Sequence, residues 1–177
     1  MRDSVAVSYS LLQRWFNRSK PQLAESKEPA TPEQQFRMGL KFAQGEGVLP
    51  DQVQAARYFA QAAEQNHGMA QYHLAMLYAN GQGVRRDHAI SLQWLSRAAN
   101  QGLAVAQCRL GAEQHLASRT AGATATSEAR IEALKWVQLS AAQGSREALN
   151  VSESIALGMT LEEVAESSRR VARFVAN

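Results

Sequence analysis

The residue types that could carry out chemistry are few in this sequence, and their spacing matches no reactive arrangement. The four histidines show neither an HExxH pattern nor the i, i+4 pairing with which a helix binds a metal; they are His67, His73, His88 and His115. A nucleophilic thiol needs a base within reach, and a single cysteine excludes both an internal disulfide and a zinc site built from cysteines. We therefore predict that Cys108 is a small packed residue. The expected protein is not an enzyme and has no cofactor and no metal site.

Two glycine-containing triplets resemble parts of a phosphate-binding loop. They lie at residues 45–47 (GEG) and 81–83 (GQG). A dinucleotide-binding loop has the longer pattern GxGxxG after a strand, and neither triplet has this pattern or follows a predicted strand. We predict that both triplets form turns.

Composition places the chain among ordinary folded proteins. It has 177 residues, of which 45% are hydrophobic and 20% are charged, and its net charge is +3. This length is sufficient for one domain, or one array, with a substantial core. Lys and Arg are not concentrated in runs, so we predict no nucleic-acid partner. No stretch of about 18 apolar residues is present, so no membrane-spanning helix is expected.

The amino-terminal residues do not fit a secretory signal, because polar residues interrupt every apolar run and no cleavage site follows. We therefore expect a cytoplasmic location. Residues 1–20 have the spacing of an amphipathic helix, and residues 21–30 form a polar linker. Two alternatives remain for this helix: it lies on a membrane surface, or it packs on its own protein. The apolar residues that would make either contact are Leu11, Leu12, Trp15 and Phe16.

The rest of the chain is repetitive. Residues 36–70 align without gaps to residues 72–106 at an offset of 36, and a third copy begins at Cys108. The second half of the third copy is displaced by 42 residues, which predicts an expanded loop at 118–128. The predicted division is three repeats followed by carboxy-terminal capping helices, at residues 31–70, 71–106, 107–148 and 149–177.

Each copy is predicted to form two antiparallel helices. Thr31, followed by Pro32 and by Gln34, is typical of a helix start, and Gly45 is typical of a helix end. Asp51 and its counterparts cap the second helices. Small residues at equivalent positions would let paired helices approach closely; they are Gly39, Ala75 and Gly111. A column of aromatic residues should pack between repeats; its members are Tyr58, Trp94 and Trp136.

The last helix is predicted to begin with a second capping box, at Thr160 and Glu163. One side of this helix is apolar and contains Val164, Val171, Phe174 and Val175. Its opposite side is charged, as the end of a repeat array requires. No segment alternates with a period of two, so we expect no sheet.

The stretch LAMLYANGQGVRRDHAISLQWLSRAANQGLAVA resembles the Sel-one-like repeat (SLR), a relative of the tetratricopeptide repeat. The resemblance covers residues 36–148. It implies an all-α, right-handed α-solenoid that acts as an adaptor or scaffold between proteins, with no enzymatic activity in the repeat itself. The third copy departs from the pattern, since residues 117–119 replace the GxG turn and Gln114 stands where an aromatic residue is expected.

The apolar residues of each first helix that should face its second helix form a core stripe, for example Leu74, Ala75 and Tyr78. A second apolar stripe lies about 120° around the same helix. The resemblance to tetratricopeptide arrays implies that this stripe lines the concave groove and binds a partner protein. Its members are Phe36, Leu40, Ala43, Tyr72, Met76, Ala79, Cys108, Ala112 and His115, and possible rim contacts are Arg37, His73 and Arg109. Two alternatives remain: neighbouring helices bury the stripe, or it is a groove for an amphipathic helix. The predicted function is a non-catalytic protein-interaction scaffold, and the alternative is a membrane-associated adaptor that uses residues 1–20.

Overall fold

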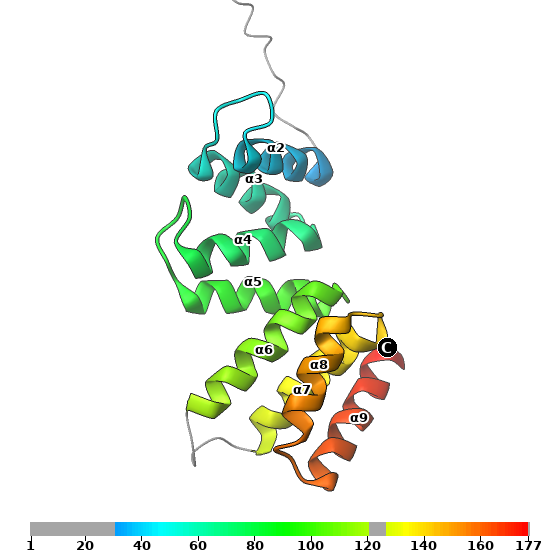
Figure 1. Cartoon of the computed structure of the whole chain (residues 1–177). Coiled ribbons are helices and arrows are strands. Elements are labelled where there is room, and N and C mark those ends of the chain that lie inside the picture. The colour runs from blue at the N-terminus through cyan, green and yellow to red at the C-terminus, as the bar shows by residue number, and fades with distance from the viewer. Residues whose placement is uncertain (1–30, 121–126, 177) are drawn as a thin grey trace, which may run out of the picture. The chain divides into compact units, whose positions relative to one another are not determined.

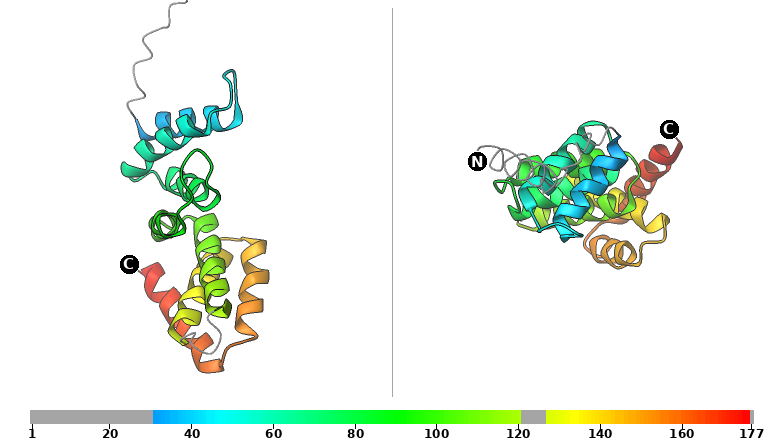
Figure 2. Two further views of the ribbon diagram at one scale, coloured as in Figure 1. Left: turned by 90° about the vertical axis from the view of Figure 1, so that its left-hand side faces the viewer. Right: turned by 90° about the horizontal axis from the view of Figure 1, so that it is seen from above.

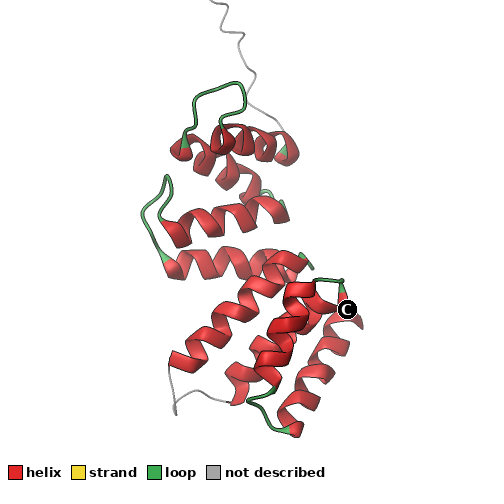
Figure 3. Ribbon diagram, viewed as in Figure 1, coloured by secondary structure: helices red, strands yellow, loops and turns green. Residues whose placement is uncertain are grey.

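The computed structural model describes residues 31–120 and 127–176, and in these ranges it contains helices and no strand (Figure 3). The predicted absence of a sheet is confirmed for this part of the chain. The predicted helix at 1–20 and linker at 21–30 lie outside the described residues. The helices are α2 (Pro32–Gln44), α3 (Gln52–Glu64), α4 (Gly68–Asn80), α5 (His88–Asn100), α6 (Ala104–Thr120), α7 (Ser127–Ala142), α8 (Arg146–Ala156) and α9 (Leu161–Ala176).

The helices form consecutive hairpins, in which α2 pairs with α3, α4 with α5, and α6 with α7 (Figure 1). Neighbouring hairpins contact each other through α3 with α4 and through α5 with α6, so they stack in chain order (Figure 2). Helices α8 and α9 both pack on α7. This arrangement is an all-α solenoid, as the repeats predict.

The predicted start and end of α2 and the predicted start of α3 are confirmed. The Thr31 hydroxyl accepts a hydrogen bond from the Gln34 backbone N–H, and the Gln34 side chain accepts one from the Thr31 N–H. Gly45 ends α2 with a left-handed φ of 78°. Asp51 caps α3 by accepting from two backbone N–H groups. After α3, Asn66 takes a φ of 67°, which asparagine tolerates better than most other residues.

The third repeat differs because it lacks the glycine turn. Helices α2 and α4 each contain 13 residues, whereas α6 contains 17 and continues to Thr120. Residues 117–119 include no glycine that would readily take a positive φ, so the helix is not interrupted there. The predicted loop at 118–128 was therefore wrong at both ends, since residues 118–120 and 127–128 are helical.

Close approach within each hairpin depends on the predicted small residues. Gly39 lies against the ring of Phe59, and Gly111 lies against Val137. The aromatic column is only partly as predicted. Trp94 packs against two core clusters, one shared by the first and second repeats and one shared by the second and third. The Tyr58 ring, however, stacks on Phe42 of its own repeat at 5.6 Å. The fully buried aromatic residue of α3 is Phe59, beside the predicted Tyr58.

A pair of glutamines joins the two helices of each repeat, and we call this pair the glutamine clamp. In the second repeat, the Gln101 Nε2 donates to Gln71 Oε1 at 2.6 Å, and Gln71 Nε2 donates to the Ala63 carbonyl of the repeat before it. Gln71 is 1% exposed, so these bonds form away from water. The equivalent pairs are Gln35 with Gln65 and Gln107 with Gln143. In the second and third repeats the clamp thus also links each repeat to the one before it.

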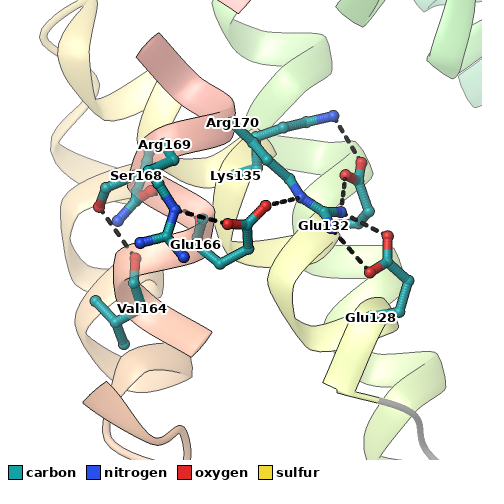
Figure 4. A network of polar contacts seen from close by, with 10 residues as sticks. Glu128, Glu132, Lys135, Val164, Glu166, Ser168, Arg169 and Arg170 are labelled. Carbon is teal, nitrogen blue, oxygen red and sulfur yellow. Dashed lines mark hydrogen bonds and ion pairs between the residues drawn. The ribbon is translucent and has the colours of Figure 1, made fainter. Parts of the chain in front are cut away.

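Helix α9 is attached to α7 by an ionic network (Figure 4). The Arg170 guanidinium donates hydrogen bonds to Glu128, Glu132 and Glu166. Hydrogen bonds from Arg170 lower the pKa of Glu128, and those from Arg169 and then Arg170 lower the pKa of Glu166. These residues are partly exposed, so we expect the network to contribute little to the free energy of unfolding.

The apolar side of α9 is narrower than predicted. Val171 and Phe174 pack against the core cluster of the second and third repeats, and Val164 packs against the cluster that includes α8. Val175 is 72% exposed, so its predicted place on the apolar side is wrong.

We expect Glu163→Gln to reduce the acid sensitivity of the fold. Hydrogen bonds from the Ser127 hydroxyl, the Thr160 backbone N–H and Arg130 hold the pKa of Glu163 at about 2, below its usual 4.5. Because the pKa is lowered in the folded state, this stabilisation is complete above about pH 4.5 and is lost as the pH falls toward 2. The measurement is the urea midpoint at pH 7 and pH 3. The decrease in the urea midpoint from pH 7 to pH 3 should be smaller in Glu163→Gln than in the wild type.

The control is Glu162→Gln, which removes the neighbouring exposed carboxylate. It should retain the pH dependence of the wild type. An equal loss of stability between pH 7 and pH 3 in the wild type and Glu163→Gln would contradict the role of Glu163.

Candidate functional site

A pocket of about 450 Å³ lies between α4, α6 and the turn that joins α7 to α8. We call it the groove pocket. Four residues of the predicted stripe and its rim line it, namely Tyr72, Cys108, Arg109 and Ala112. The other lining residues are Ala104, Val105, Gln143, Gly144, Ser145 and Glu147.

The wall that the α7–α8 turn forms is fixed by the third glutamine clamp. Gln143 Nε2 donates to Gln107 Oε1 at 2.8 Å and to the Gly102 carbonyl at 3.0 Å. Gly144 then takes a φ of 90°, and the Ser145 hydroxyl accepts from the Ala148 N–H to begin α8. The groove pocket is therefore held open by hydrogen bonds on its own wall, which makes it preformed.

The groove pocket is apolar on its floor and charged at its edges. Arg109 forms an ion pair with Glu113 at 2.7 Å, one turn along α6. Burial raises the pKa of the Cys108 thiol, and the charge of Glu147 raises it further, while Arg109 opposes the change. The thiol is thus protonated at neutral pH, and it lacks the thiolate that a nucleophile requires.

The stripe residues of the first repeat have a different environment. Phe36, Leu40 and Ala43 are half-buried and pack against the cluster that α3 and α4 form. In the second repeat, Met76 packs against the cluster of α5 and α6, and Ala79 is half-buried. Neighbouring helices therefore cover much of the stripe in these two repeats.

His73 lies in an aromatic cluster. Its ring stacks on Phe59 with the centroids 5.2 Å apart and lies 5.5 Å from Phe36 and 5.7 Å from Tyr72. Burial lowers the pKa of His73, so the imidazole is neutral at pH 7. His73 therefore packs among rings, whereas the rim residue Arg37 is exposed on α2.

His67 has a structural role at the start of α4. Its Nδ1 accepts a hydrogen bond from the Ala70 N–H, and its Nε2 lies 3.0 Å from the Glu33 carboxylate. The ring also stacks on Phe36 at 4.7 Å. These contacts connect the start of α4 to α2.

His115, the last residue of the predicted stripe, lines another pocket of about 400 Å³, which Arg119 and Arg130 also line. Burial lowers the pKa of His115, and the positive charge of Arg119 lowers it further. This residue is separate from the groove pocket. The stripe thus divides into a covered first half, a groove pocket and this carboxy-terminal pocket.

No group of three His, Cys, Asp or Glu residues within the described ranges could hold a metal ion. Sequence analysis missed the contribution of the α7–α8 turn and the start of α8, which supply Gln143 and Glu147 to the groove pocket. The signal was present in the alignment, because Gln143 occupies the position of Gln101 in the preceding repeat. The spacing showed that Gln143 corresponds to Gln101, but it did not show that Gln143 lies beside α6.

The predicted membrane or intramolecular contacts lie outside the described residues; they are Leu11, Leu12, Trp15 and Phe16. Among the helices that the structure describes, none combines the length and the apolar character needed to cross a bilayer.

Comparison with known proteins supports the repeat assignment. Residues 32–67, 68–103 and 104–145 each match the model of the Sel1 repeat, and together they cover more than half of the chain. No sequence among the curated proteins matches the chain.

Two solved structures have a similar fold. One is a Sel1 repeat protein from Oxalobacter formigenes, with 31% identity and a TM-score of 0.59, where the match covers 70% of this chain and 88% of that one. The other is a protective antigen present in uropathogenic Escherichia coli strains that displays an SLR fold. It has 26% identity and a TM-score of 0.64, and the match covers 91% of this chain and 33% of the antigen. The chain therefore spans about a third of the length of the antigen.

Proposed function

Because the chain belongs to the Sel1 repeat family, whose repeats are generally protein–protein interaction modules, we propose that it is a scaffold that binds a partner segment in the groove pocket. The observation that carries this proposal is the convergence of Tyr72, Cys108 and Ala112 with the α7–α8 turn around one preformed cavity. Members of the family are typically non-catalytic scaffolds. The protonated Cys108 thiol agrees with a binding role for the pocket.

The chemistry of the groove pocket suits a short segment with an apolar anchor. Val105 is 41% exposed and extends the apolar floor to the entrance. Arg109 and Glu147 supply opposite charges at the edges, where they would orient a segment more than they would tighten its binding. The clamp at Gln143 holds the wall before binding, which lowers the entropic cost of association.

Val105→Asp is expected to weaken partner binding at least about tenfold, because it places a charge on the apolar floor of the groove pocket. The matched control is Leu116→Asp, which makes the same change on an exposed apolar residue of the same helix outside the groove pocket. The measurement is recovery of bound proteins on the immobilised wild type and both variants, from a lysate of the source organism. Circular dichroism establishes that each variant is folded.

The proposal requires that the wild type and Leu116→Asp both recover a bound protein that Val105→Asp does not recover. Equal recovery on all three, or loss only with Leu116→Asp, would contradict binding in the groove pocket.

The alternative of a membrane-associated adaptor, together with the expected cytoplasmic location, stays a prediction. The membrane-associated alternative depends on residues 1–20, which lie outside the described range. A liposome pelleting assay tests this alternative, because deletion of residues 1–20 should then abolish lipid binding. The possible docking of residues 4–16 on the repeats is likewise a prediction.

A further inference from the structure

A further pocket, of about 480 Å³, lies between α5 and α6. It shares no residue with the groove pocket, and we call it the α5–α6 pocket. Its lining residues are Leu92, Gln93, Ser96, Arg97, Leu110 and Gln114. It is thus formed by the second helix of one repeat and the first helix of the next.

The preceding repeat shows what occupies the same place between α3 and α4. At the offset of 36 residues, the counterpart of Gln114 is Tyr78, and the counterparts of Leu92 and Leu110 are Ala56 and Leu74. The Tyr78 ring packs against the core cluster that contains both of those counterparts. At this junction between repeats, an aromatic ring of the chain itself therefore packs against the cluster that α3 and α4 share.

At the next junction the aromatic ring is missing. Gln114 replaces it, and the space beside Leu92 and Leu110 remains open. Leu110, one of the lining residues, is 3% exposed and belongs to the core cluster of the second and third repeats. The α5–α6 pocket is consequently the position of an aromatic side chain that this repeat does not supply.

The polar groups of the α5–α6 pocket narrow the chemistry of an occupant. Gln114 Oε1 is buried and has no hydrogen-bond partner among the described residues. A buried acceptor without a donor is unfavourable, and the broad terminal torsion of glutamine lets the amide turn toward a donor in the pocket. Arg97 lies at the edge, with its guanidinium over the Trp94 ring at 4.6 Å.

We propose that the α5–α6 pocket binds a tyrosine side chain of a partner protein. The ring occupies the place that Tyr78 takes at the preceding junction, against Leu92 and Leu110. The tyrosine hydroxyl donates a hydrogen bond to Gln114 Oε1. A phenylalanine fills the same space but leaves this oxygen without a donor. This site is an interaction surface separate from the groove pocket, and it does not depend on the function proposed for that pocket.

The test uses N-acetyl-tyrosinamide and N-acetyl-phenylalaninamide as probes of the intact protein. NMR titration should shift the methyl signals of Leu92 and Leu110 and the side-chain amide signal of Gln114. We expect the tyrosine probe to bind at least about fivefold more tightly than the phenylalanine probe, since only the former satisfies the buried oxygen. No shift with either probe, or tighter binding of phenylalanine, would overturn the proposal.

Two variants separate the roles of shape and hydrogen bonding. Gln114→Leu removes the acceptor, so both probes should bind this variant equally. Gln114→Tyr supplies the missing ring from the chain itself, so neither probe should shift the leucine methyl signals. Val105→Asp, in the groove pocket, should leave both titrations unchanged. Retention of the tyrosine preference in Gln114→Leu would overturn the assignment of Gln114.

Discussion

Gly83→Ala is expected to destabilise the protein by about 3 kcal/mol, whereas the same change at Gly47 should cost about 1 kcal/mol. The two glycines are equivalent residues of consecutive GxG turns, with φ values of 69° and 70°. Both changes therefore carry the same penalty for placing a side chain in the left-handed region. The additional cost at Gly83 comes from contact between repeats.

The difference arises from what surrounds each turn. A methyl group on Gly83 would overlap the backbone carbonyl of Gln52 and lie 2.7 Å from the Val53 nitrogen, at the start of α3 in the preceding repeat. A methyl group on Gly47 would have no described atom within 4 Å. Backbone atoms cannot move aside as a flexible side chain can, so Gly83→Ala must separate the two repeats.

Thermal or urea unfolding of the two variants measures this difference. The melting temperature should fall several degrees further for Gly83→Ala than for Gly47→Ala, at about 2–4 °C per kcal/mol for a chain of this size. Equal destabilisation would show that the turn of one repeat does not pack on the start of α3.

The second large effect is a coupling between Gly39 and Phe59. A methyl group on Gly39 would lie 2.5 Å from two ring carbons of Phe59, so Gly39→Ala should cost about 2–3 kcal/mol. The second repeat carries Ala75 and Leu95 at the equivalent positions, and both are buried there. The pair Ala with Leu therefore already packs in this fold.

A double-mutant cycle tests this interpretation. Phe59→Leu alone should destabilise the protein by about 1–2 kcal/mol, because it leaves unfilled space against Gly39. The double variant Gly39→Ala/Phe59→Leu reproduces the second repeat and should be more stable than the sum of the single changes by at least about 1 kcal/mol. Urea unfolding of the four proteins gives the coupling. Additive effects would contradict direct packing of the ring on Gly39.

Local features of the fold could be predicted from the sequence because each depends on only a few neighbouring residues. The capping box at Thr31 and the left-handed Asn66 follow from side-chain chemistry within one turn of helix. The continuation of α6 to Thr120 shows the limit of this reasoning. The alignment detected extra residues in the third repeat and assigned them to a loop, although the absence of glycine allowed a longer helix.

The candidate site could be predicted only in part, because contacts between helices depend on rotations that spacing along one helix does not determine. Spacing placed Tyr72 and Ala112 on a shared stripe, and both line the groove pocket. The same spacing placed Phe36 on the stripe, but this residue packs against α4. The opposite wall, with Gln143 and Glu147, comes from the α7–α8 turn and the start of α8, whose positions depend on the length of α7.

Photocrosslinking from two positions of α6 tests the central claim most directly. The photoreactive residue p-benzoylphenylalanine replaces Val105, in the groove pocket, or Leu116, on the same helix outside it, in protein expressed in the source organism. Position 105 should form a covalent adduct with a partner protein, and unlabelled Val105→Asp protein should fail to compete with that adduct. Position 116 should form none with the same partner. An adduct from position 116 without one from position 105 would contradict binding of a partner in the groove pocket.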